Sequence, residues 1–358
     1  MASARSEPQK SRSIMHLANF PSPRQPTLFT DEPENKLMKK IVAWKSLPED
    51  VLAYLQQHAE VVQVDPAQHD TFVAALKDAD GGIGSSVKIT PAMLEGASRL
   101  KALSTISVGF DQFDVADLTR RGIVLAHTPD VLTESTADTV FSLILASARR
   151  VVELADWVKA GEWKQSIGPA HFGVDVQGKT LGIVGLGRIG GAVARRAALG
   201  FNMKVLYTNR SANAQAEQAY GARRVELAEL LATADFVCLQ VPLTPETKHM
   251  IGAAEFKSMK KSAILINASR GATVDEQALI EALQNATIHG AGLDVFETEP
   301  LPADSPLLKM ANVVALPHIG SATHETRHAM ALNAAENLVA ALDGTLATNI
   351  VNREVLKK

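Results

Sequence analysis

The sequence predicts an α/β protein with two doubly wound parallel sheets, each covered by helices on both faces. Three observations carry this prediction. Strand-like and helix-like segments alternate from Met38 onward, a glycine-rich turn occupies residues 185–190, and a second series of apolar strand-like runs follows that turn. Alternation of this kind favours a parallel sheet, because parallel strands need a crossover connection, which is usually a helix.

The first part of the alternation begins at Met38. Strand-like runs are predicted in "KKIVAW", "AEVVQVD", "LKALSTISVG" and "GIVLAHT", and helices in "LPEDVLAYLQQH" and "AQHDTFVAALKDA". The proline near the start of the first helix suits the first turn, where its missing N–H group has no helical partner to lose. These segments predict one α/β unit before residue 134.

A long helix is predicted next, from about Glu134 through "STADTVFSLILASARRVVELADWVKAGEW". Its apolar residues are too many for one stripe, so we expect it to be buried between elements or against another subunit. Strand-like runs then recur at "TLGIVG", "KVLYT", "DFVCLQV", "SAILINA", "HGAGLDVF" and "NVVALP". The second α/β unit is therefore expected to lie between the first unit and a C-terminal helix.

The composition limits the classes of function that the chain can have. The chain has 358 residues, enough for two domains, and its net charge of −3 gives no pull toward nucleic acid or a membrane surface. No apolar run approaches the roughly 20 residues of a membrane span. The single cysteine, Cys238, is expected to be a buried apolar residue and fits a reducing compartment, the cytoplasm. Residues 1–37, rich in proline and serine, predict a disordered and dispensable extension.

The turn "GLGRIG" places Gly185, Gly187 and Gly190 in a G-x-G-x-x-G pattern between an apolar strand and a helix. Three spaced glycines alone are weak evidence, but this context is the one that the dinucleotide-binding motif requires. The first glycine permits the tight turn, the second lets the backbone approach a pyrophosphate, and the third lets helix and strand pack closely. The pyrophosphate would meet N–H groups at the positive end of the helix.

The following strand and the turn after it read "KVLYTNRSAN". At the end of this strand an acidic residue is expected, which would bind the hydroxyls of the adenosine ribose. Asn209 stands 19 residues after Gly190, close to the roughly 20-residue spacing of that acid. Asparagine removes the repulsion that a carboxylate exerts on a 2′-phosphate, Arg210 supplies a planar cation, and Ser211 can add a neutral donor. Together they favour NADP, although Arg210 alone could be an ordinary surface arginine. Arg188, inside the turn, could assist or simply be exposed.

Three later segments put reactive side chains at the carboxyl ends of strands, where ligands of open α/β sheets gather. "AILINASRG" delivers Arg270, "HGAGLDVFETEP" delivers Asp294 and Glu299, and "NVVALPHIGSAT" delivers His318. An arginine can bind a substrate carboxylate or polarise its carbonyl, and a histidine can give a proton to the oxygen as hydride reaches carbon. A carboxylate beside the imidazole favours its charged form. The set suits reduction of a 2-keto acid, although each residue taken singly would be ordinary.

Four ordered motifs, "GLGRIGGAVARRA", "ASRGATVDEQAL", "GAGLDVFETEP" and "PHIGSATHETR", resemble the D-isomer-specific 2-hydroxyacid dehydrogenase family. The resemblance runs from about Met38 to Asn352, and "SVGFDQFDV" also matches the family's substrate loop. It implies a flavodoxin-like substrate domain at residues 38–133 and 319–352, and a Rossmann NAD(P)-binding domain at residues 134–318, with the active cleft between them. It further implies a homodimer and reduction of a keto acid, for which residues 209–211 predict NADPH as the cofactor and NAD as a weaker one. The substrates would be small 2-keto acids such as glyoxylate, hydroxypyruvate and 2-ketogluconate, and the products D-2-hydroxy acids.

The resemblance also implies roles for particular residues. Arg270 corresponds to the substrate-binding and catalytic arginine, Glu299 to the acid paired with the catalytic histidine, and His318 to the proton donor. Val108 and Gly109 match the loop whose backbone N–H groups hold the substrate carboxylate. Besides the glycines of the turn and residues 209–211, the implied cofactor-binding residues are Leu186, Arg188, Ile189, Val241, Pro242, Thr247, Ala268, Ser269, Asp294 and Gly320.

Two other functions stay open at this point. "HETRH", from His324 to His328, matches the zinc-protease signature H-E-x-x-H, with Glu325 as the possible base. A catalytic zinc site needs a third protein ligand, which the sequence does not indicate, and so we expect no metal. Some relatives of the family resemble transcriptional corepressors that sense the dinucleotide, but a complete Arg270–Glu299–His318 set argues against a pure binding role.

Overall fold

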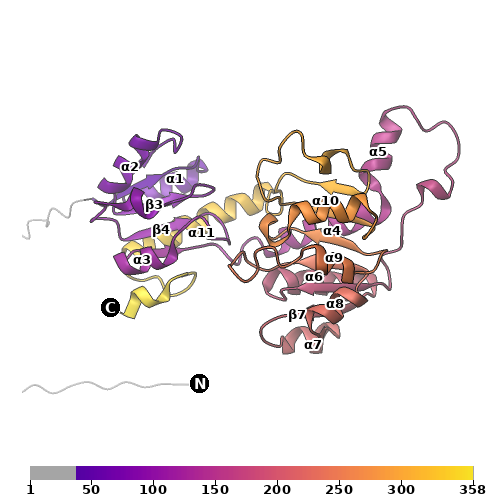
Figure 1. Cartoon of the computed structure of the whole chain (residues 1–358). Coiled ribbons are helices and arrows are strands. Elements are labelled where there is room, and N and C mark those ends of the chain that lie inside the picture. The colour runs from indigo at the N-terminus through magenta and orange to yellow at the C-terminus, as the bar shows by residue number, and fades with distance from the viewer. Residues whose placement is uncertain (1–37, 358) are drawn as a thin grey trace, which may run out of the picture. The chain divides into compact units, whose positions relative to one another are not determined.

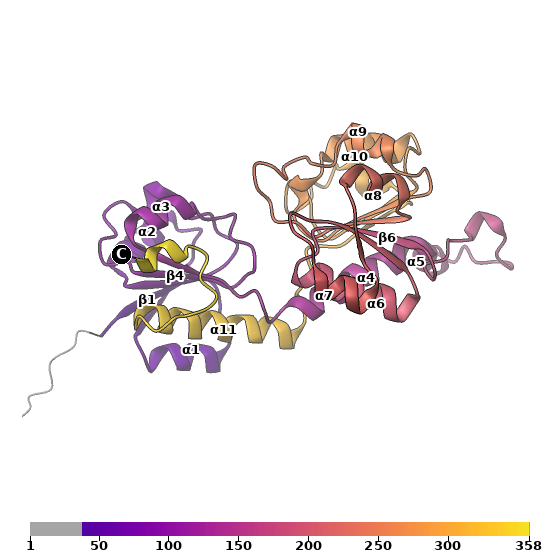
Figure 2. The same ribbon diagram turned by 90° about the horizontal axis from the view of Figure 1, so that it is seen from below.

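Residues 38–357 are described by the computed structural model of the chain, and the predicted extension at residues 1–37 lies outside them. Within the described range the strands form two parallel sheets, one of five strands and one of seven. Helices cover both faces of each sheet (Figure 1 and Figure 2). The predicted fold class, two doubly wound parallel α/β sheets, is confirmed.

The first sheet has the strand order β2-β1-β3-β4-β5, which is the flavodoxin-like order. Its strands are β1 (Lys40–Ala43), β2 (Glu60–Gln63), β3 (Gly81–Gly84), β4 (Ala102–Thr105) and β5 (Val124–Ala126). The helices α1 (Glu49–Gln56) and α11 (His324–Leu342) cover one face, and α2 (His69–Asp78) and α3 (Val115–Arg121) the other (Figure 2). α11 comes from the C-terminal end of the chain and packs on β3, β4, β5 and α1.

The second sheet has the order β12-β11-β10-β9-β6-β7-β8, the Rossmann order extended by one strand. Its strands are β6 (Thr180–Val184), β7 (Lys204–Thr208), β8 (Arg223–Arg224), β9 (Phe236–Leu239), β10 (Ile264–Asn267), β11 (Gly290–Leu293) and β12 (Val313–Ala315). Figure 2 shows α4 (Thr133–Arg149), α6 (Arg188–Phe201) and α7 (Ala214–Tyr220) on one face, and α8 (Leu227–Thr233), α9 (Ala253–Ser258) and α10 (Glu276–Gln284) on the other. Short 3-10 helices complete the chain: Pro91–Leu94, Pro169–His171, Gly271–Thr273, Pro306–Lys309 and Arg353–Lys357.

Side chains along the central strands alternate between the two faces of the second sheet, as strand geometry requires. Ile183, Cys238 and Ile266 belong to the apolar cluster beneath α4 and α6. Their neighbours Leu239 and Leu265 belong to the cluster beneath the other helices. Because both faces are covered, the strands read as continuous apolar runs, which is why they could be recognised in the sequence.

Side-chain caps set the start of several helices. The Asp114 carboxylate accepts the N–H of Asp117 at 2.8 Å and starts α3, which ends at Gly122 in the left-handed conformation. Thr323 caps α11 in the same way by accepting the N–H of Thr326 at 3.1 Å. These caps satisfy N–H groups that have no partner inside the helix.

The predicted long helix is wrong in one respect, because it is two helices. α4 ends at Arg149, and α5 (Val151–Lys159) begins after Arg150, whose φ of +54° lies in the left-handed region. The Arg150 guanidinium donates to both carboxylate oxygens of Glu153, at 2.6 and 2.8 Å, and also to the Ala170 carbonyl, so it stabilises the break. α4 has many buried residues, as predicted, whereas α5 has none.

Two short strands were not predicted from the sequence. β3 is "GGIG", a composition that strands usually avoid, yet Gly84 accommodates the indole of Trp44, with which a Cβ at that position would collide. β8 consists of two arginines on the edge of the second sheet, too short for any periodic pattern. Tertiary contacts, and not local preference, create both strands.

Cys238 lies in β9 and is fully buried, in agreement with its predicted role as a small apolar side chain. Burial raises the pKa of its thiol to about 12. Among residues 38–357 no helix is long and apolar enough to cross a membrane.

Candidate active site

The glycine turn follows β6, at the point where the strand order of the second sheet reverses between β6 and β9. Gly185 has a φ of +100°, and a Cβ there would lie 2.7 Å from the carbonyl oxygen of Gln240. A Cβ at Gly190 would collide with the Gly185 carbonyl oxygen, whereas at Gly187 it would meet nothing within 4 Å. The turn is thus tight where the chain must turn and pack, and open where a pyrophosphate would approach, so these residues fit a dinucleotide.

Residues 209–211 follow β7, and Arg210 and Ser211 among them are exposed. Hydrogen bonds connect the end of this loop to its surroundings. The Asn213 amide donates to the Leu186 carbonyl inside the glycine turn at 3.2 Å, and the Asn213 backbone N–H donates to the Tyr207 hydroxyl at 2.7 Å. Asn213 also caps α7. Its role in joining the loop to the turn was not predicted.

His318 and Glu299 lie together after strands β12 and β11. The Glu299 Oε2 atom and the His318 Nδ1 atom are 2.7 Å apart, while Oε1 of Glu299 accepts the Phe296 N–H at 3.0 Å. With Nδ1 bound to the carboxylate, Nε2 is the ring nitrogen that remains for a substrate, and the side chain is 48% exposed. Burial alone would raise the pKa of Glu299, but the hydrogen bonds from His318 and Phe296 outweigh it and hold that pKa below its ordinary value.

Asp294 holds the loop that carries the histidine. Its two carboxylate oxygens accept the N–H groups of Ile319 and Gly320 at 2.7 and 2.8 Å, and its side chain is buried. Burial raises the pKa of Asp294, against the lowering effect of these two hydrogen bonds. His318, the preceding residue, has a φ of +54°, a conformation that costs a residue with a Cβ about 1–2 kcal/mol. The clamp on the next two residues holds the backbone in this strained state.

Arg270 is positioned by a network that begins at Asn267, the last residue of β10. The Asn267 amide donates to the Arg270 carbonyl at 3.0 Å, and its oxygen accepts the Ser269 N–H and hydroxyl. The Thr273 hydroxyl donates to the same Arg270 carbonyl at 2.7 Å. Asn267 is buried and was not predicted, although the polar end of an apolar strand was a possible signal.

The loop that bears Arg270 packs tightly on the loop that bears Glu299. A Cβ at Gly271 would collide with the Phe296 carbonyl carbon, so only glycine allows this approach. The close contact brings the arginine into the electrostatic environment of Glu299, whose pKa it helps to lower. The structure therefore brings together the three residues that the sequence predicted as one set.

Arg270 also reaches the loop after β4. Its Nε atom donates to the Asp111 carboxylate at 3.0 Å, and its Nη1 atom to the Ser269 carbonyl at 2.7 Å. The Nη2 atom lies over Gly109, in the space that a Cβ on this residue would occupy. Gly109 and Arg270, which the family resemblance implied as substrate-binding residues, are in direct contact.

Side chains around the loop of Val108 and Gly109 fix its shape. The Val108 carbonyl lies 2.9 Å from His127 Nδ1, and the Gly109 carbonyl accepts the Ser107 hydroxyl at 2.6 Å. Burial lowers the pKa of His127, so the ring is neutral at pH 7 and Nδ1–H can donate to Val108. Both carbonyls of the loop are thus bound to side chains of the protein, which fixes the orientation of its peptide groups. His127 was not predicted.

The remaining predicted cofactor residues lie around the same edge of the second sheet. Val241 and Pro242 follow β9, Ala268 and Ser269 follow β10, and Leu186 and Ile189 belong to the glycine turn and the start of α6. The Thr247 hydroxyl donates to the Pro242 carbonyl at 2.6 Å. Arg188, also at the start of α6, forms an exposed ion pair with Asp130 at 3.0 Å.

The H-E-x-x-H match lies on the first turns of α11. The Nε2 atom of His328 is 2.7 Å from the Asp50 carboxylate of α1, an exposed pair that joins two helices. Within residues 38–357 no group of three or more His, Cys, Asp and Glu side chains could hold a metal ion. Nothing in the described residues supplies the third ligand that a catalytic zinc requires.

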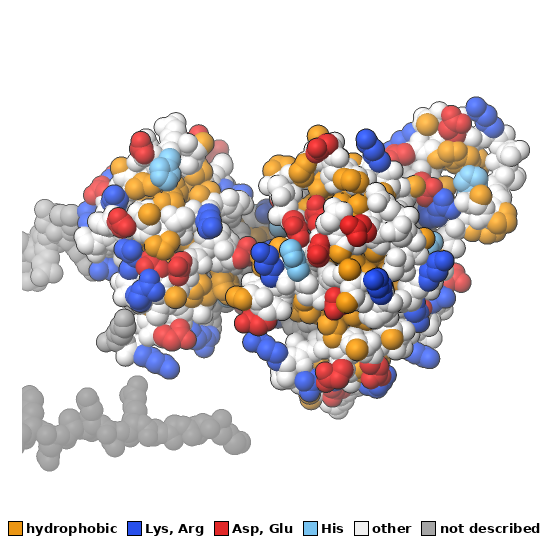
Figure 3. All heavy atoms as spheres, in the orientation of Figure 1, with side chains coloured by type: hydrophobic (Ala, Val, Ile, Leu, Met, Phe, Trp, Pro, Cys, Tyr) orange, Lys and Arg blue, Asp and Glu red, His pale blue; other side chains and the backbone are white. Residues whose placement is uncertain are grey.

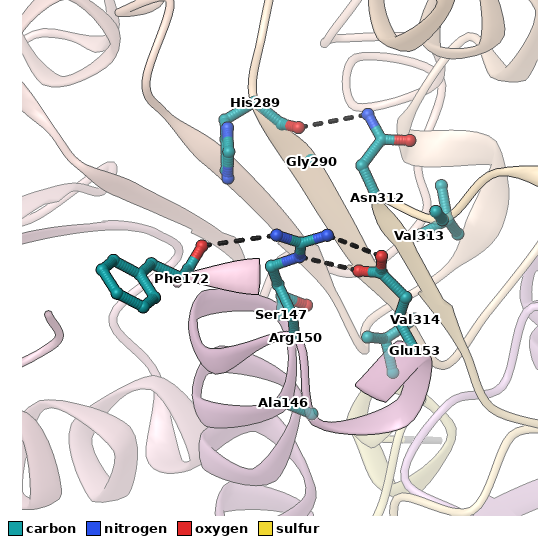
Figure 4. Close-up of a pocket in the computed structure, with 11 residues that line it drawn as sticks. Ala146, Ser147, Arg150, Glu153, Phe172, His289, Gly290, Asn312, Val313 and Val314 are labelled. Carbon is teal, nitrogen blue, oxygen red and sulfur yellow. Dashed lines mark hydrogen bonds and ion pairs between the residues drawn. The ribbon is translucent and has the colours of Figure 1, made fainter. Parts of the chain in front are cut away.

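A cavity of about 220 Å³ lies at the opposite edge of the second sheet (Figure 4). Gly290 and Val313, which line it, are the first residues of β11 and β12, so the cavity is at the amino ends of these strands. The Arg150–Glu153 pair and Phe172 border it as well (Figure 4). It therefore has no part in the site formed by His318, Glu299 and Arg270 at the carboxyl ends.

Sequence comparisons found similar proteins. A family model described as "D-isomer specific 2-hydroxyacid dehydrogenase, NAD binding domain" matches residues 141–320. A curated relative from Yersinia enterocolitica, named glyoxylate/hydroxypyruvate reductase B, is 58% identical over 321 residues, which are 89% of this chain and 98% of the relative. A relative of the same name from Serratia proteamaculans is also 58% identical over 321 residues, with coverage of 89% and 99%.

Solved structures share the fold. A protein from Thermus thermophilus is 41% identical with a TM-score of 0.80, covering 87% of this chain and 99% of its own. An NADPH-dependent glyoxylate/hydroxypyruvate reductase from Sinorhizobium meliloti, in complex with NADP and malonate, is 34% identical with a TM-score of 0.80. That match covers 88% of this chain and 98% of the other.

Proposed function

Since this chain belongs to the D-isomer specific 2-hydroxyacid dehydrogenase family, and is thus an NAD(P)-dependent oxidoreductase, we propose that it uses NADPH to reduce small 2-keto acids. The substrates are glyoxylate, hydroxypyruvate and 2-ketogluconate, and the products are D-2-hydroxy acids. The observation that carries the proposal is the pairing of His318 with Glu299 at 2.7 Å next to Arg270. The curated relatives named for glyoxylate and hydroxypyruvate support the first two substrates.

Each residue of the set has a role in this reaction. The nicotinamide, when bound, supplies the hydride that reaches the C2 carbonyl. His318 gives the proton to the carbonyl oxygen from Nε2, and Glu299 orients the ring and balances its charge. Arg270 and the N–H groups of Val108 and Gly109 bind the substrate carboxylate and direct the carbonyl toward the histidine.

The two units of the fold have different roles in the proposal. Residues 38–133 and 319–352, which include the first sheet and α11, form the substrate domain. Residues 134–318, which include the second sheet and the glycine turn, form the NAD(P)-binding domain. The packing of α11 on β3, β4 and β5 supports the assignment of the C-terminal segment to the first domain.

The preference for NADPH rests on the end of β7. Asn209 carries no charge that would repel a 2′-phosphate, and Arg210 and Ser211 are exposed donors beside the glycine turn. The NADPH-dependent relative from Sinorhizobium meliloti supports the same cofactor. NAD is the weaker alternative.

Combining Asn209→Asp with Arg210→Ala should reverse the cofactor preference. Loss of the arginine is expected to raise the KM for NADPH about tenfold to hundredfold, the effect of one or two hydrogen bonds to a charged group. The new carboxylate should lower the KM for NADH by accepting the ribose hydroxyls. Steady-state kinetics with both cofactors on the double variant and both single variants measure the change. If the ratio of kcat/KM for NADPH to kcat/KM for NADH stays unchanged, residues 209 and 210 do not contact the cofactor.

A steady-state assay of the wild type tests the whole proposal. NADPH and NADH are each paired with glyoxylate, hydroxypyruvate and 2-ketogluconate, and kcat/KM is compared over the six combinations. We expect turnover of at least one acid, with NADPH preferred. If none of the three oxidises NADPH, the function of a dinucleotide-sensing corepressor becomes the better explanation.

A homodimer is the proposed assembly. Exposed apolar side chains gather on α5 and the segment that follows it, at the upper right of Figure 3: Val151, Val152, Val158, Trp163, Ile167 and Phe172. A patch of this kind favours a protein partner, and a second copy would cover it together with the neighbouring cavity. The proposed compartment is the cytoplasm, whose reducing conditions suit a chain with one cysteine.

Light scattering should give twice the mass of the chain. The variant with Val152→Glu and Trp163→Ser should dissociate, because two apolar contacts are replaced by polar groups that lose hydration at an interface. Glu229→Gln, an exposed change on α8 far from α5 in the chain, is the control and should stay dimeric. A monomeric wild type would refute this part of the proposal.

A further inference from the structure

The short edge strand β8 places an arginine beside the cofactor loop. In the parallel register of β7 and β8, Leu206 lies opposite Arg223 and Tyr207 opposite Arg224. The carboxyl ends of neighbouring parallel strands meet at one edge of a sheet. Arg224, the last residue of β8, therefore lies beside the loop that begins at Asn209.

Arg224 holds this loop by its backbone. Its Nη2 atom donates to the Asn209 carbonyl at 2.9 Å and to the Arg210 carbonyl at 3.2 Å, and its Nε atom donates to the Asn209 carbonyl at 3.1 Å. The other end of the loop is held at Asn213 by Tyr207 and by the glycine turn. The segment that carries Arg210 and Ser211 is thus fixed at both ends.

Arg224 differs from its neighbour Arg223 in its electrostatic partners. Arg223, the preceding residue, forms an ion pair with Glu229 at 2.7 Å. In the described part of the chain, neither Arg224 nor Arg210 has a carboxylate within ion-pair distance. The positive charge of Arg210 nevertheless helps to lower the pKa of Glu246. Two guanidinium groups that form no ion pair within residues 38–357, at one sheet edge, are suited to a dianion such as a phosphate monoester.

We propose that Arg224 is a second specificity-determining residue for the 2′-phosphate of NADP(H). It fixes the backbone of Asn209 and Arg210 and adds its own positive charge to that of Arg210. The inference rests on the proposed NADPH preference. Arg224 lies outside both the glycine turn and the β7 loop. Its sequence position, 14 residues after Arg210, hides it from any local motif.

The test compares two ligands that differ only in the phosphate. Adenosine 2′,5′-bisphosphate and 5′-AMP are each titrated calorimetrically into the wild type and the Arg224→Ala, Arg224→Lys and Arg223→Ala variants. Arg224→Ala should raise the Kd for the bisphosphate about tenfold to hundredfold. The Kd for 5′-AMP should stay within about twofold of the wild-type value. Lysine keeps the charge but loses the fork that grips two carbonyls, so Arg224→Lys should show an intermediate loss.

Arg223→Ala is the matched control, because it removes the same side chain from the same strand. It should leave the binding of both ligands unchanged. The inference would be overturned if Arg224→Ala bound both ligands as tightly as Arg223→Ala does. It would also be overturned if Arg224→Ala lost affinity for both ligands by the same factor. Retained 5′-AMP binding shows that each variant is folded.

The ligand titration also separates this inference from the proposed reaction. The titration contains no 2-keto acid. Its result therefore remains interpretable even if the enzyme reduces none of the three acids. A wild type that binds the bisphosphate no better than 5′-AMP contradicts both the NADPH preference and the role of Arg224. Strong bisphosphate binding that survives Arg224→Ala contradicts the role of Arg224 alone.

Discussion

Replacing His318 with asparagine is expected to lower kcat by about a hundredfold to ten-thousandfold, the range found for a positioned general acid. The imidazole is held through Nδ1 by Glu299, which leaves Nε2 to give the proton. Asparagine can keep a hydrogen bond to the carboxylate but has no titratable proton. Steady-state kinetics with glyoxylate measure kcat, and fluorescence titration with NADPH should show binding close to that of the wild type.

The chain contains a matched control for this experiment. His328 and Asp50 form a second histidine–carboxylate pair at the same 2.7 Å, with a similar exposed fraction of the imidazole, 44% against 48% for His318. His328→Asn should leave kcat unchanged. A variant of His318 that loses NADPH affinity while keeping kcat would contradict the role of proton donor.

Glu299→Gln adds a test of the partner and of its charge. Glutamine preserves the size of the side chain but cannot balance an imidazolium, so kcat should fall less than in the histidine variant. Because the pKa of Glu299 is lowered from 4.5, its contribution to stability is present above that value and is lost as pH falls through the lowered pKa. The difference in melting temperature between wild type and variant should therefore shrink only in acid.

The second large effect is expected from Gly109→Ala. The added Cβ would collide with Nη2 of Arg270 and would lie 2.7 Å from its Cζ atom. The guanidinium must move, and displacement by about 1 Å at a reacting centre can cost about a hundredfold in rate. We expect kcat/KM for the 2-keto acid to fall by that order while NADPH affinity is kept.

Gly168→Ala is the control for the effect of the substitution itself. Gly168 lies in the segment after α5, and a Cβ there would meet nothing within 4 Å. Its kinetics should match the wild type. A Gly109→Ala enzyme with wild-type kcat/KM would show that Arg270 does not lie over this glycine during turnover.

The parts of the fold that could be predicted are those with a local physical signature. Buried parallel strands are continuous apolar runs, and the glycine turn combines three spaced glycines with a strand before and a helix after them. Arg270, Glu299 and His318 could be grouped because each follows a strand, and the carboxyl ends of parallel strands converge. The family resemblance, confirmed by the comparisons, gave the same set.

The parts that could not be predicted depend on contacts between distant residues. The break at Arg150 is stabilised by the Ala170 carbonyl, twenty residues away, and the helical pattern on either side of it is uninterrupted. β3 is a strand because it pairs with β1 and β4, against the preference of its glycines. No window of sequence contains these interactions.

Residues that hold the loops of the site by their backbone carbonyls were also missed. Asn267 fixes the Arg270 loop, His127 fixes the Val108 carbonyl, and Arg224 fixes the β7 loop. In each case a side chain donates to a backbone carbonyl, an interaction that almost any loop can accept. Sequence pattern therefore identifies the reactive groups better than the residues that support them.

The burial of Cys238 has a practical consequence for experiments on this enzyme. It is the only thiol in the chain, it has no exposed surface, and its pKa of about 12 keeps it protonated at neutral pH. Thiolates, and not thiols, react with maleimides and oxidants. The wild type is therefore a silent background, in which one cysteine introduced at a chosen surface position would carry a spectroscopic label without first removing a native one.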